Sequence, residues 1–429
     1  MAFVDQLSPV SLLLLTFLVG SGAALHIPAY QASVADLVPR SQVPQAILLN
    51  GVSYNLTRSA GPALGGALVA TVGAAVAFAV NAVSHIALIV VLLRETSFST
   101  LDTLPREPIG GAIRAGLRYV MKAPTIRTVL IRGMVFGIGS AALQALLPLV
   151  AKTMLGGGPK LYGVLFGFFG LGGVFGAFGS VRLRKRVGHE WTVRRGFLGQ
   201  AVASAIVAAG SPLWLVAIAM FVSGTTWVMA LSLFNATIQL AMPRWVAART
   251  LALYQTLTFG GMALGSWIRG TLAEIDGLQL AFAGSSAMRL AGMVVGFLRP
   301  MPESTPDNLA PVERWTEPET AVELGKDSGP IMVAIDYAIA EEDLADFLAL
   351  MRERSLIRQR NGASGWTLSR DTQRAEQWTE MYYLPTWLGY IRHNKRTTQA
   401  DAENTDKIRA LHRGSQAPVV TRRLVRSRL

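Results

Sequence analysis

Asn50, Tyr54 and Arg58 stand four residues apart in a stretch that is otherwise apolar. Residues spaced by four share one face of an α-helix, so these side chains form a polar stripe. The stripe could contact a polar or anionic small molecule, or pair with a partner on another helix. The alternative is that Arg58 extends along its helix to reach lipid headgroups. An arginine inside a membrane costs at least about 2.5–3.5 kcal/mol on insertion scales, so its presence needs one of these explanations.

A motif rich in glycine and proline directly follows the polar stripe. The sequence GPALGG places Gly61, Pro62, Gly65 and Gly66 in the same apolar stretch. Proline bends a helix, and glycine lets a neighbouring helix approach closely. We therefore expect these four residues to have a conformational role rather than to contact a substrate.

The composition of the chain is typical of a membrane protein. Of the 429 residues, 51% are hydrophobic and 16% are charged, whereas soluble domains carry about 25% charged residues. Residues 1–300 hold 22 Lys and Arg against 8 Asp and Glu, so the basic excess belongs to the apolar part. Basic loops between apolar segments favour a lipid bilayer as partner and argue against nucleic acid.

Several kinds of chemistry are excluded by the residues present. The chain has no cysteine, which rules out disulfides, thiolate catalysis and thiolate metal sites. The five histidines are scattered without metal-ligand spacing, and no GxxxxGK[ST] phosphate loop occurs. The C-terminal part offers no acid–base or nucleophile constellation around His393. We therefore expect no enzyme activity, no cofactor and no metal.

Residues 1–300 are predicted to form an all-α polytopic membrane domain with nine transmembrane helices. A spanning helix needs about 20 mainly apolar residues. Segments of that kind lie at 9–35, 45–70, 72–93, 128–151, 160–181, 192–210, 212–241, 250–272 and 277–298. The intervening residues 94–127 are basic and amphipathic, which predicts a linker helix on the membrane surface. Since the basic loops face inward, the C-terminal region is expected in the cytoplasm.

An internal repeat relates the two parts of this membrane domain. The stretch around Pro39-Arg40 can be laid over that around Pro243-Arg244 without a gap, so that Gly61 meets Gly265. Parallel repeats of six helices build several transporters. Three helices precede the second copy of the repeat and none precedes the first. The pattern therefore predicts a twelve-helix arrangement that lacks its first three helices.

The sequence resembles the major facilitator superfamily. GPALGG at 61–66 resembles the proline-glycine motif in the fifth helix of its antiporters, and the string PAYQASVADLVPRSQVPQAILLNGVSYNLTRSAGPALGG resembles the enterobactin-exporter-like efflux branch. The resemblance implies a multi-pass protein of the bacterial inner membrane. Its function would be proton-driven efflux of a small organic molecule, siderophore or drug-like, by alternating access. It also implies that the helices carrying Gln31, Gln144 and Asn235 line the central cavity, which adds these residues to the stripe of Asn50, Tyr54 and Arg58 as substrate contacts.

The alternative function starts from the acidic residues. In residues 1–300 each of them lies in a loop, at a helix end or at the N-terminal tip, although proton-coupled transporters usually carry the proton on a carboxylate within the membrane. The chain could therefore be a transport-inactive, truncated membrane protein whose cytoplasmic domain binds a ligand or partner.

The C-terminal part is predicted to be a separate α+β domain. Residues 301–329 are rich in Pro, Glu, Ser and Thr and predict a linker. In residues 330–414 the order of strand and helix patterns favours a small ferredoxin-like domain. The strings LPTWLGYIRHNKRTTQAD and IRALHRG resemble a soluble extension found on some members of the family, and this domain could support self-association. Residues 415–429 are expected to form a basic, disordered tail.

Overall fold

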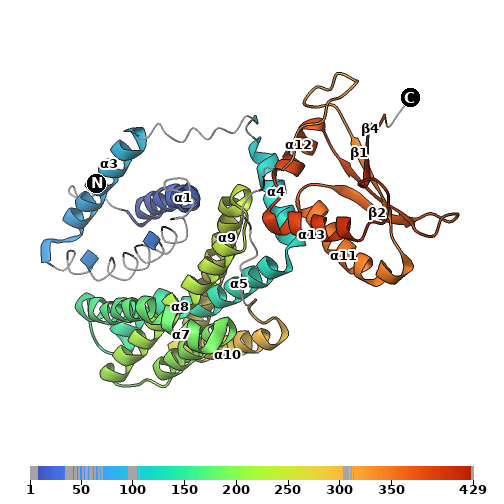
Figure 1. The fold of residues 1–429 in the computed structure, drawn as a ribbon. Coiled ribbons are helices and arrows are strands. Elements are labelled where there is room, and N and C mark those ends of the chain that lie inside the picture. The colour runs from blue at the N-terminus through green and yellow to red at the C-terminus, as the bar shows by residue number, and fades with distance from the viewer. Residues whose placement is uncertain are drawn as a thin grey trace. The chain divides into compact units, whose positions relative to one another are not determined.

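The computed structural model describes residues 8–33, 71–94, 107–302 and 314–426, with isolated positions between 42 and 68 and at 104, 105, 309 and 312. The chain forms two compact units. Unit 1 consists of Met1–Arg106, Thr128–Gln239 and Leu251–Glu303, and unit 2 consists of Glu107–Arg127, Leu240–Thr250 and Ser304–Leu429. Figure 1 shows the helices of unit 1 and the sheet of unit 2.

Helices make up the described part of unit 1. They are α1 (Pro9–Ser33), α3 (Ala74–Arg94), α5 (Pro124–Ala145), α6 (Leu147–Leu149), the π-helix η2 (Val150–Met154), α7 (Pro159–Ala208), α8 (Leu213–Leu240), α9 (Arg244–Ile275) and α10 (Gly277–Leu298). The first residues of α5 and α9 belong to unit 2. Gly188, with a φ of 79°, interrupts α7 between two of the predicted apolar segments.

Polytopic membrane character is confirmed, whereas the count of nine spans stays a prediction. Among the described residues, four segments are long and apolar enough to cross a membrane: Pro124–Met154, Lys160–Ser180, Leu213–Leu240 and Gly277–Leu298. Helices also occupy the predicted segments at 9–35, 72–93, 192–210 and 250–272 where the structure describes them. Most of the predicted segment at 45–70 lies outside the described residues.

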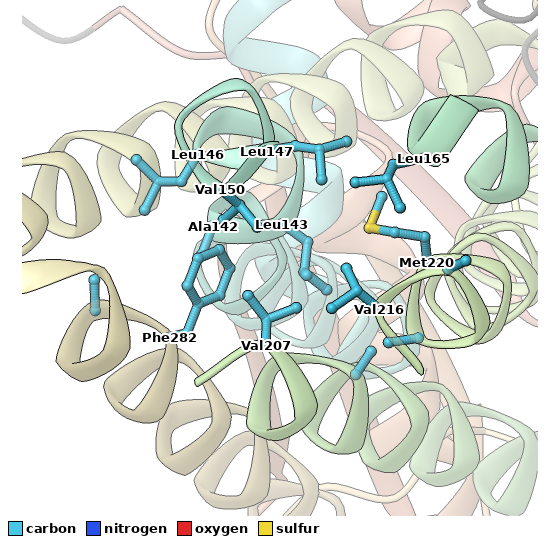
Figure 2. Close-up of a cluster of buried hydrophobic side chains, with 14 residues drawn as sticks. Ala142, Leu143, Leu146, Leu147, Val150, Leu165, Val207, Val216, Met220 and Phe282 are labelled. Atoms are coloured by element: carbon cyan, nitrogen blue, oxygen red, sulfur yellow. The ribbon is translucent and has the colours of Figure 1, made fainter. Parts of the chain in front are cut away.

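An apolar cluster forms a core among α5, α7, α8 and α10 (Figure 2). Leu143, Leu165, Val207, Met220 and Phe282 are each at most 1% exposed. Lipid tails are as apolar as these side chains, so burial from water does not drive their association within a bilayer. The cluster stabilises the bundle through close van der Waals packing instead.

Glycines bring pairs of helices into backbone contact. A Cβ on Gly172 of α7 would collide with the Phe221 carbonyl of α8, and a Cβ on Gly224 of α8 would collide with the Phe169 carbonyl of α7. A similar contact joins Gly265 of α9 to α5. Small residues at such crossings let the two backbones approach closely, so that backbone contacts take the place of side-chain packing. These contacts hold α7 against α8 and α9 against α5 at short separations.

Unit 2 contains a four-stranded antiparallel sheet covered by helices on one face. Its elements are β1 (Ile331–Ala338), η3 (Glu341–Asp343), α11 (Leu344–Arg360), β2 (Ser364–Arg370), β3 (Gln377–Leu384), α12 (Trp387–Lys395), α13 (Gln399–Ala410) and β4 (Val419–Leu424). The strand order is β2-β3-β1-β4. Alternate residues of β1 are buried, from Ile331 to Tyr337, as the sequence pattern predicts. The arrangement is the β-α-β-β-α-β order expected of a ferredoxin-like domain.

The expectation of a disordered tail at 415–429 is wrong for its central part. Residues 419–424 form β4, which pairs with β1, so that Ile331 faces Leu424 and Asp336 faces Val419. The basic residues around it obscured a short strand pattern. Pairing with β1 satisfies backbone groups on the edge of the sheet, a gain that no local pattern reveals.

The predicted linker helix exists as α4 (Ile109–Lys122). Its buried face carries Ala115, Gly116, Tyr119 and Val120, and it packs against α11 of the same unit. Ile109 and Ile113 remain exposed. The amphipathic pattern therefore predicts the helix correctly, but part of the apolar surface of α4 packs against other elements of the protein. The predicted contact of α4 with a membrane surface stays a prediction.

Candidate functional site

The predicted polar stripe lies largely outside the described residues. Asn50 is helical and half-buried, whereas Tyr54 and Arg58 fall outside the description. Gln31 lies in α1, where only its backbone is described. Of the conformational motif, Gly61 and Gly65 are helical, and Pro62 and Gly66 are not described. The roles of all these residues stay predictions.

Gln144 and Asn235 are described but have different surroundings. Gln144 is half-buried near the end of α5. Asn235 lies half-buried in α8, and its Oδ1 accepts a hydrogen bond from Gln239 Nε2 at 2.9 Å. This bond lies within one helix, and no hydrogen bond from Asn235 to another helix is found among the described contacts. Its part-exposed amide remains suited to a polar ligand.

A buried polar network that the sequence analysis missed lies among the helices of unit 1. Arg289 of α10 is 1% exposed. Its Nη1 donates to the Gln200 carbonyl at 2.6 Å and to Ser204 Oγ, both on α7. Gln200 in turn exchanges hydrogen bonds with Ser223 of α8. One guanidinium group thus joins a chain of polar groups that crosses three helices.

This guanidinium group is incompletely paired. Nε and Nη2 of Arg289 have no hydrogen-bond partner among the described residues, and no ion pair to it is found there. Arg269 of α9 is also buried, with Nη2 against Met288 Sδ at 3.0 Å and Nε unpaired within the described part. Guanidinium groups are donors only, and their attraction to anions grows in a low-dielectric environment. The arrangement can therefore bind an anionic group or a carbonyl oxygen.

Arg269 and Arg289 were not predicted as site residues, because basic residues were expected in the loops between apolar segments. Both stand inside apolar helical segments, at 250–272 and 277–298. An isolated arginine near the middle of such a segment was the signal that could have found them.

A carboxylate ties three helices together elsewhere in unit 1. Glu190 Oε1 accepts from Arg132 of α5 at 3.3 Å and from Arg194 of α7 at 2.7 Å. Its Oε2 accepts from the Met301 backbone N–H, just after α10, at 2.6 Å. Arg194 also stacks 3.8 Å from the centre of the Phe297 ring.

The α+β domain contains a second buried network, built around Glu380. This carboxylate is fully buried and accepts from Arg354, Arg358 and Trp366, each at 3.1 Å. Burial raises the pKa of Glu380, but Arg358 and Arg354 outweigh it and hold the value at about 2. The acid is permanently ionised at neutral pH and fully hydrogen-bonded, which indicates a structural role rather than proton transfer.

His393, the histidine weighed as a possible catalytic residue, also has a structural role. Its Nδ1 donates to the Asn361 carbonyl at 3.3 Å, and its Nε2 accepts from Arg358 Nη1 at 3.2 Å. Burial and the charge of Arg358 lower the pKa of His393 to about 3. Both ring nitrogens are thus occupied in the neutral form. Among the described residues no group of three or more His, Cys, Asp or Glu could hold a metal ion.

Comparisons with known proteins agree with a membrane exporter. Residues 1–429 match the family model described as transmembrane secretion effector. The multidrug efflux pump Tap of Mycolicibacterium fortuitum is 24% identical over 310 residues, which cover 70% of this chain and 75% of Tap. The enterobactin exporter EntS of Citrobacter koseri is 25% identical over 315 residues, or 70% and 74% of the two chains.

A third relative is the uncharacterized MFS-type transporter YfiS of Bacillus subtilis. It is 25% identical over 272 residues, which cover 61% of this chain and 64% of YfiS. The chain therefore spans less than two thirds of the length of YfiS and about three quarters of the length of the two exporters.

Proposed function

Because the chain belongs to the transmembrane secretion effector family of the major facilitator superfamily, we propose that it exports a small organic molecule by alternating access, driven by a proton gradient. It is a membrane transporter and not an enzyme. The names of Tap and EntS suggest a drug-like molecule or a siderophore as substrate. The chain would lie in the bacterial inner membrane with its α+β domain in the cytoplasm.

The observation that carries this proposal is the buried guanidinium group of Arg289. Two of its nitrogens lack partners among the described residues, and Arg289 lies within the segment Gly277–Leu298, which is long and apolar enough to cross a membrane. A charged residue at such depth is costly and is retained mainly where it serves transport or binding. Arg289 would attract an anionic group that enters the bundle during the cycle.

The predicted residues complete the proposed path. Asn50, Tyr54 and Arg58, with the separate residues Gln144 and Asn235, would offer polar contacts to the substrate in the central cavity; Gln31 would do the same from α1. The motif of Gly61, Pro62, Gly65 and Gly66 would let its helix bend as the two repeats rock against each other.

The experiment is an efflux assay in a bacterial strain that lacks its own drug exporters. Cells expressing the chain are loaded with ethidium, or with 2,3-dihydroxybenzoate as a catecholate probe, and the loss of each compound is followed with and without a protonophore. The proposal expects faster loss than in empty-vector cells, and expects the protonophore to abolish the difference. The proposal would be contradicted if cells that contain the folded protein lost each probe no faster than empty-vector cells.

One observation favours the second candidate, a transport-inactive protein whose cytoplasmic domain binds a ligand or partner. Among the described residues of unit 1, Glu190 is the one carboxylate that pairs with a buried arginine, and it lies at a helix start rather than within a predicted span. A proton-coupling carboxylate within the membrane is therefore missing from this part of the chain. Protein that folds but moves neither probe would support this candidate.

A further inference from the structure

Unit 2 joins three stretches of the chain that are far apart in sequence. They are residues 107–127 with the linker helix α4, residues 240–250 with the first turns of α9, and the C-terminal α+β domain. The first stretch connects the two halves of the proposed transporter. The second opens α9, which continues without interruption to Ile275.

A single carboxylate contacts all three stretches. Glu107, just before α4, forms ion pairs with Arg249 of α9 at 2.7 Å and with Arg396 of the α+β domain at 2.6 Å. Arg392 of α12 lies at 3.8 Å. Burial raises the pKa of Glu107, but Arg396 and Arg249 outweigh it and hold the pKa below its usual range. Glu107 is therefore ionised at neutral pH and faces three cations.

Aromatic rings close the same junction. The Arg396 guanidinium lies 3.9 Å from the centre of the Trp245 ring, and Trp245 meets Tyr119 of α4 edge-on, with the ring centres 5.5 Å apart. Tyr119 is 2% exposed. Cation–π contacts of this kind strengthen when they are shielded from water.

Two glycines at this junction lie close to side chains of neighbouring elements. A Cβ on Gly116 of α4 would lie 2.9 Å from Arg249 Cβ, closer than real Cβ atoms approach. A Cβ on Gly362, after α11, would lie 3.3 Å from Arg118 Nη2. Hence α4 fits between α9 and the α+β domain without room for larger side chains.

We propose that Glu107 is the positioning residue of an intramolecular latch by which the α+β domain fixes α4 to the start of α9 during the transport cycle. The inference rests on the proposed function for its effect on transport. If the halves rock against each other, a linker held to α9 moves with the second half. Without Glu107, Arg249, Arg392 and Arg396 would repel one another, since like charges close together disfavour the packed state. Releasing the latch would then alter the rate of the cycle rather than the affinity for substrate.

The first test measures the latch without measuring transport. Because the chain has no cysteine, spin labels can be placed at Ile113→Cys on α4 and Lys407→Cys on α13, both exposed. Double electron–electron resonance on the full chain should give a narrow distance distribution. Glu107→Gln and, by a steric route, Gly116→Leu should broaden it, whereas Glu107→Asp should largely preserve it. The exposed Glu323→Gln is the matched control. An unchanged distribution in both disruptive variants would overturn the latch.

The second test measures efflux, by the same variants, of whichever of the two probes the unaltered chain exports. Glu107→Gln should change the maximal rate at least threefold with less than a twofold change in the half-saturating concentration, and Glu107→Asp should recover most of the rate. Unchanged rates with a broadened distance distribution would overturn the role in the cycle. If the unaltered chain exports nothing, the proposed function fails, and the distance measurement alone decides whether the latch exists.

Discussion

At the residue scale, Arg289 is a costly buried side chain in the described part of the chain. Its guanidinium group is buried and makes two described hydrogen bonds, which leaves Nε and Nη2 unpaired in the described part of the chain. The buried Arg132 also has unpaired nitrogens, but its charge is paired with Glu190. Arg289 has no such ion pair among the described residues, and an uncompensated buried charge destabilises the fold, which favours a role in binding.

Replacing Arg289 separates stability from function. Arg289→Met keeps the length of the side chain and removes the charge, and such replacements of buried ions are often neutral or stabilising. We expect the melting temperature in detergent to fall by no more than a few degrees, while efflux of the anionic 2,3-dihydroxybenzoate falls at least tenfold. Lys160→Met, at the start of α7, should leave both unchanged. Wild-type efflux by Arg289→Met would show that the charge is not used.

Acidification should destabilise the α+β domain through His393 and Glu380. In the folded domain the pKa of His393 is lowered from 6.5 to about 3, so the unfolded state binds the proton first and stability falls as the pH drops below about 6.5. The pKa of Glu380, lowered from 4.5 to about 2, adds a further loss below about pH 4.5 with the same sign.

Amide hydrogen exchange in the full chain can measure this effect on peptides from β3 and α12. After correction for the intrinsic pH dependence, protection should be lower at pH 5 than at pH 7. His393→Gln should reduce protection at pH 7 and flatten its dependence on pH. A pH-independent protection in the unaltered chain would show that His393 is not held neutral.

At the element scale, glycines determine how closely α7 and α8 approach. Gly224→Ala would drive a methyl group into the Phe169 carbonyl, whereas a Cβ on Gly163 meets nothing within 4 Å. Overpacking costs about 1–3 kcal/mol, but alanine is about 1 kcal/mol better than glycine within an exposed helix. Gly224→Ala should therefore lower the melting temperature, whereas Gly163→Ala should raise it. Equal shifts would mean that α7 and α8 are not in contact.

The Glu190 junction should stabilise the arrangement of α5, α7 and the end of α10. Removing one partner of a buried ion pair costs about 3–5 kcal/mol because it leaves the other charge unpaired. Glu190 is 15% exposed, whereas Arg132 is fully buried. Glu190→Gln should therefore destabilise unit 1 by about 3 kcal/mol, the lower end of this range. The double variant with Arg132→Met should regain part of that loss in thermal melts. An additive double variant would exclude coupling between the two residues.

At the scale of the whole molecule, the sequence predicts what local patterns encode. Apolar segments of membrane length predict the helices, and the alternation from Ile331 to Tyr337 predicts β1, because both depend on neighbouring residues. It misses β4, whose pairing with β1 is a long-range contact. The ion pairs of Glu190, Glu107 and Glu380 could not be predicted either, because they are also long-range contacts. Their arginine partners lie up to 289 residues away in the sequence. Most of the predicted cavity stripe falls outside the described residues.

The central claim is that this chain itself moves a small organic molecule through a bundle that depends on Arg289. The most direct measurement uses purified chain in proteoliposomes with an acidic interior, diluted into neutral buffer containing ethidium or 2,3-dihydroxybenzoate. We expect accumulation of at least one probe above that of protein-free liposomes, its loss when the pH gradient is collapsed, and little accumulation of the anionic 2,3-dihydroxybenzoate with Arg289→Met. No accumulation by correctly folded, unaltered chain, or full accumulation with Arg289→Met, would contradict it.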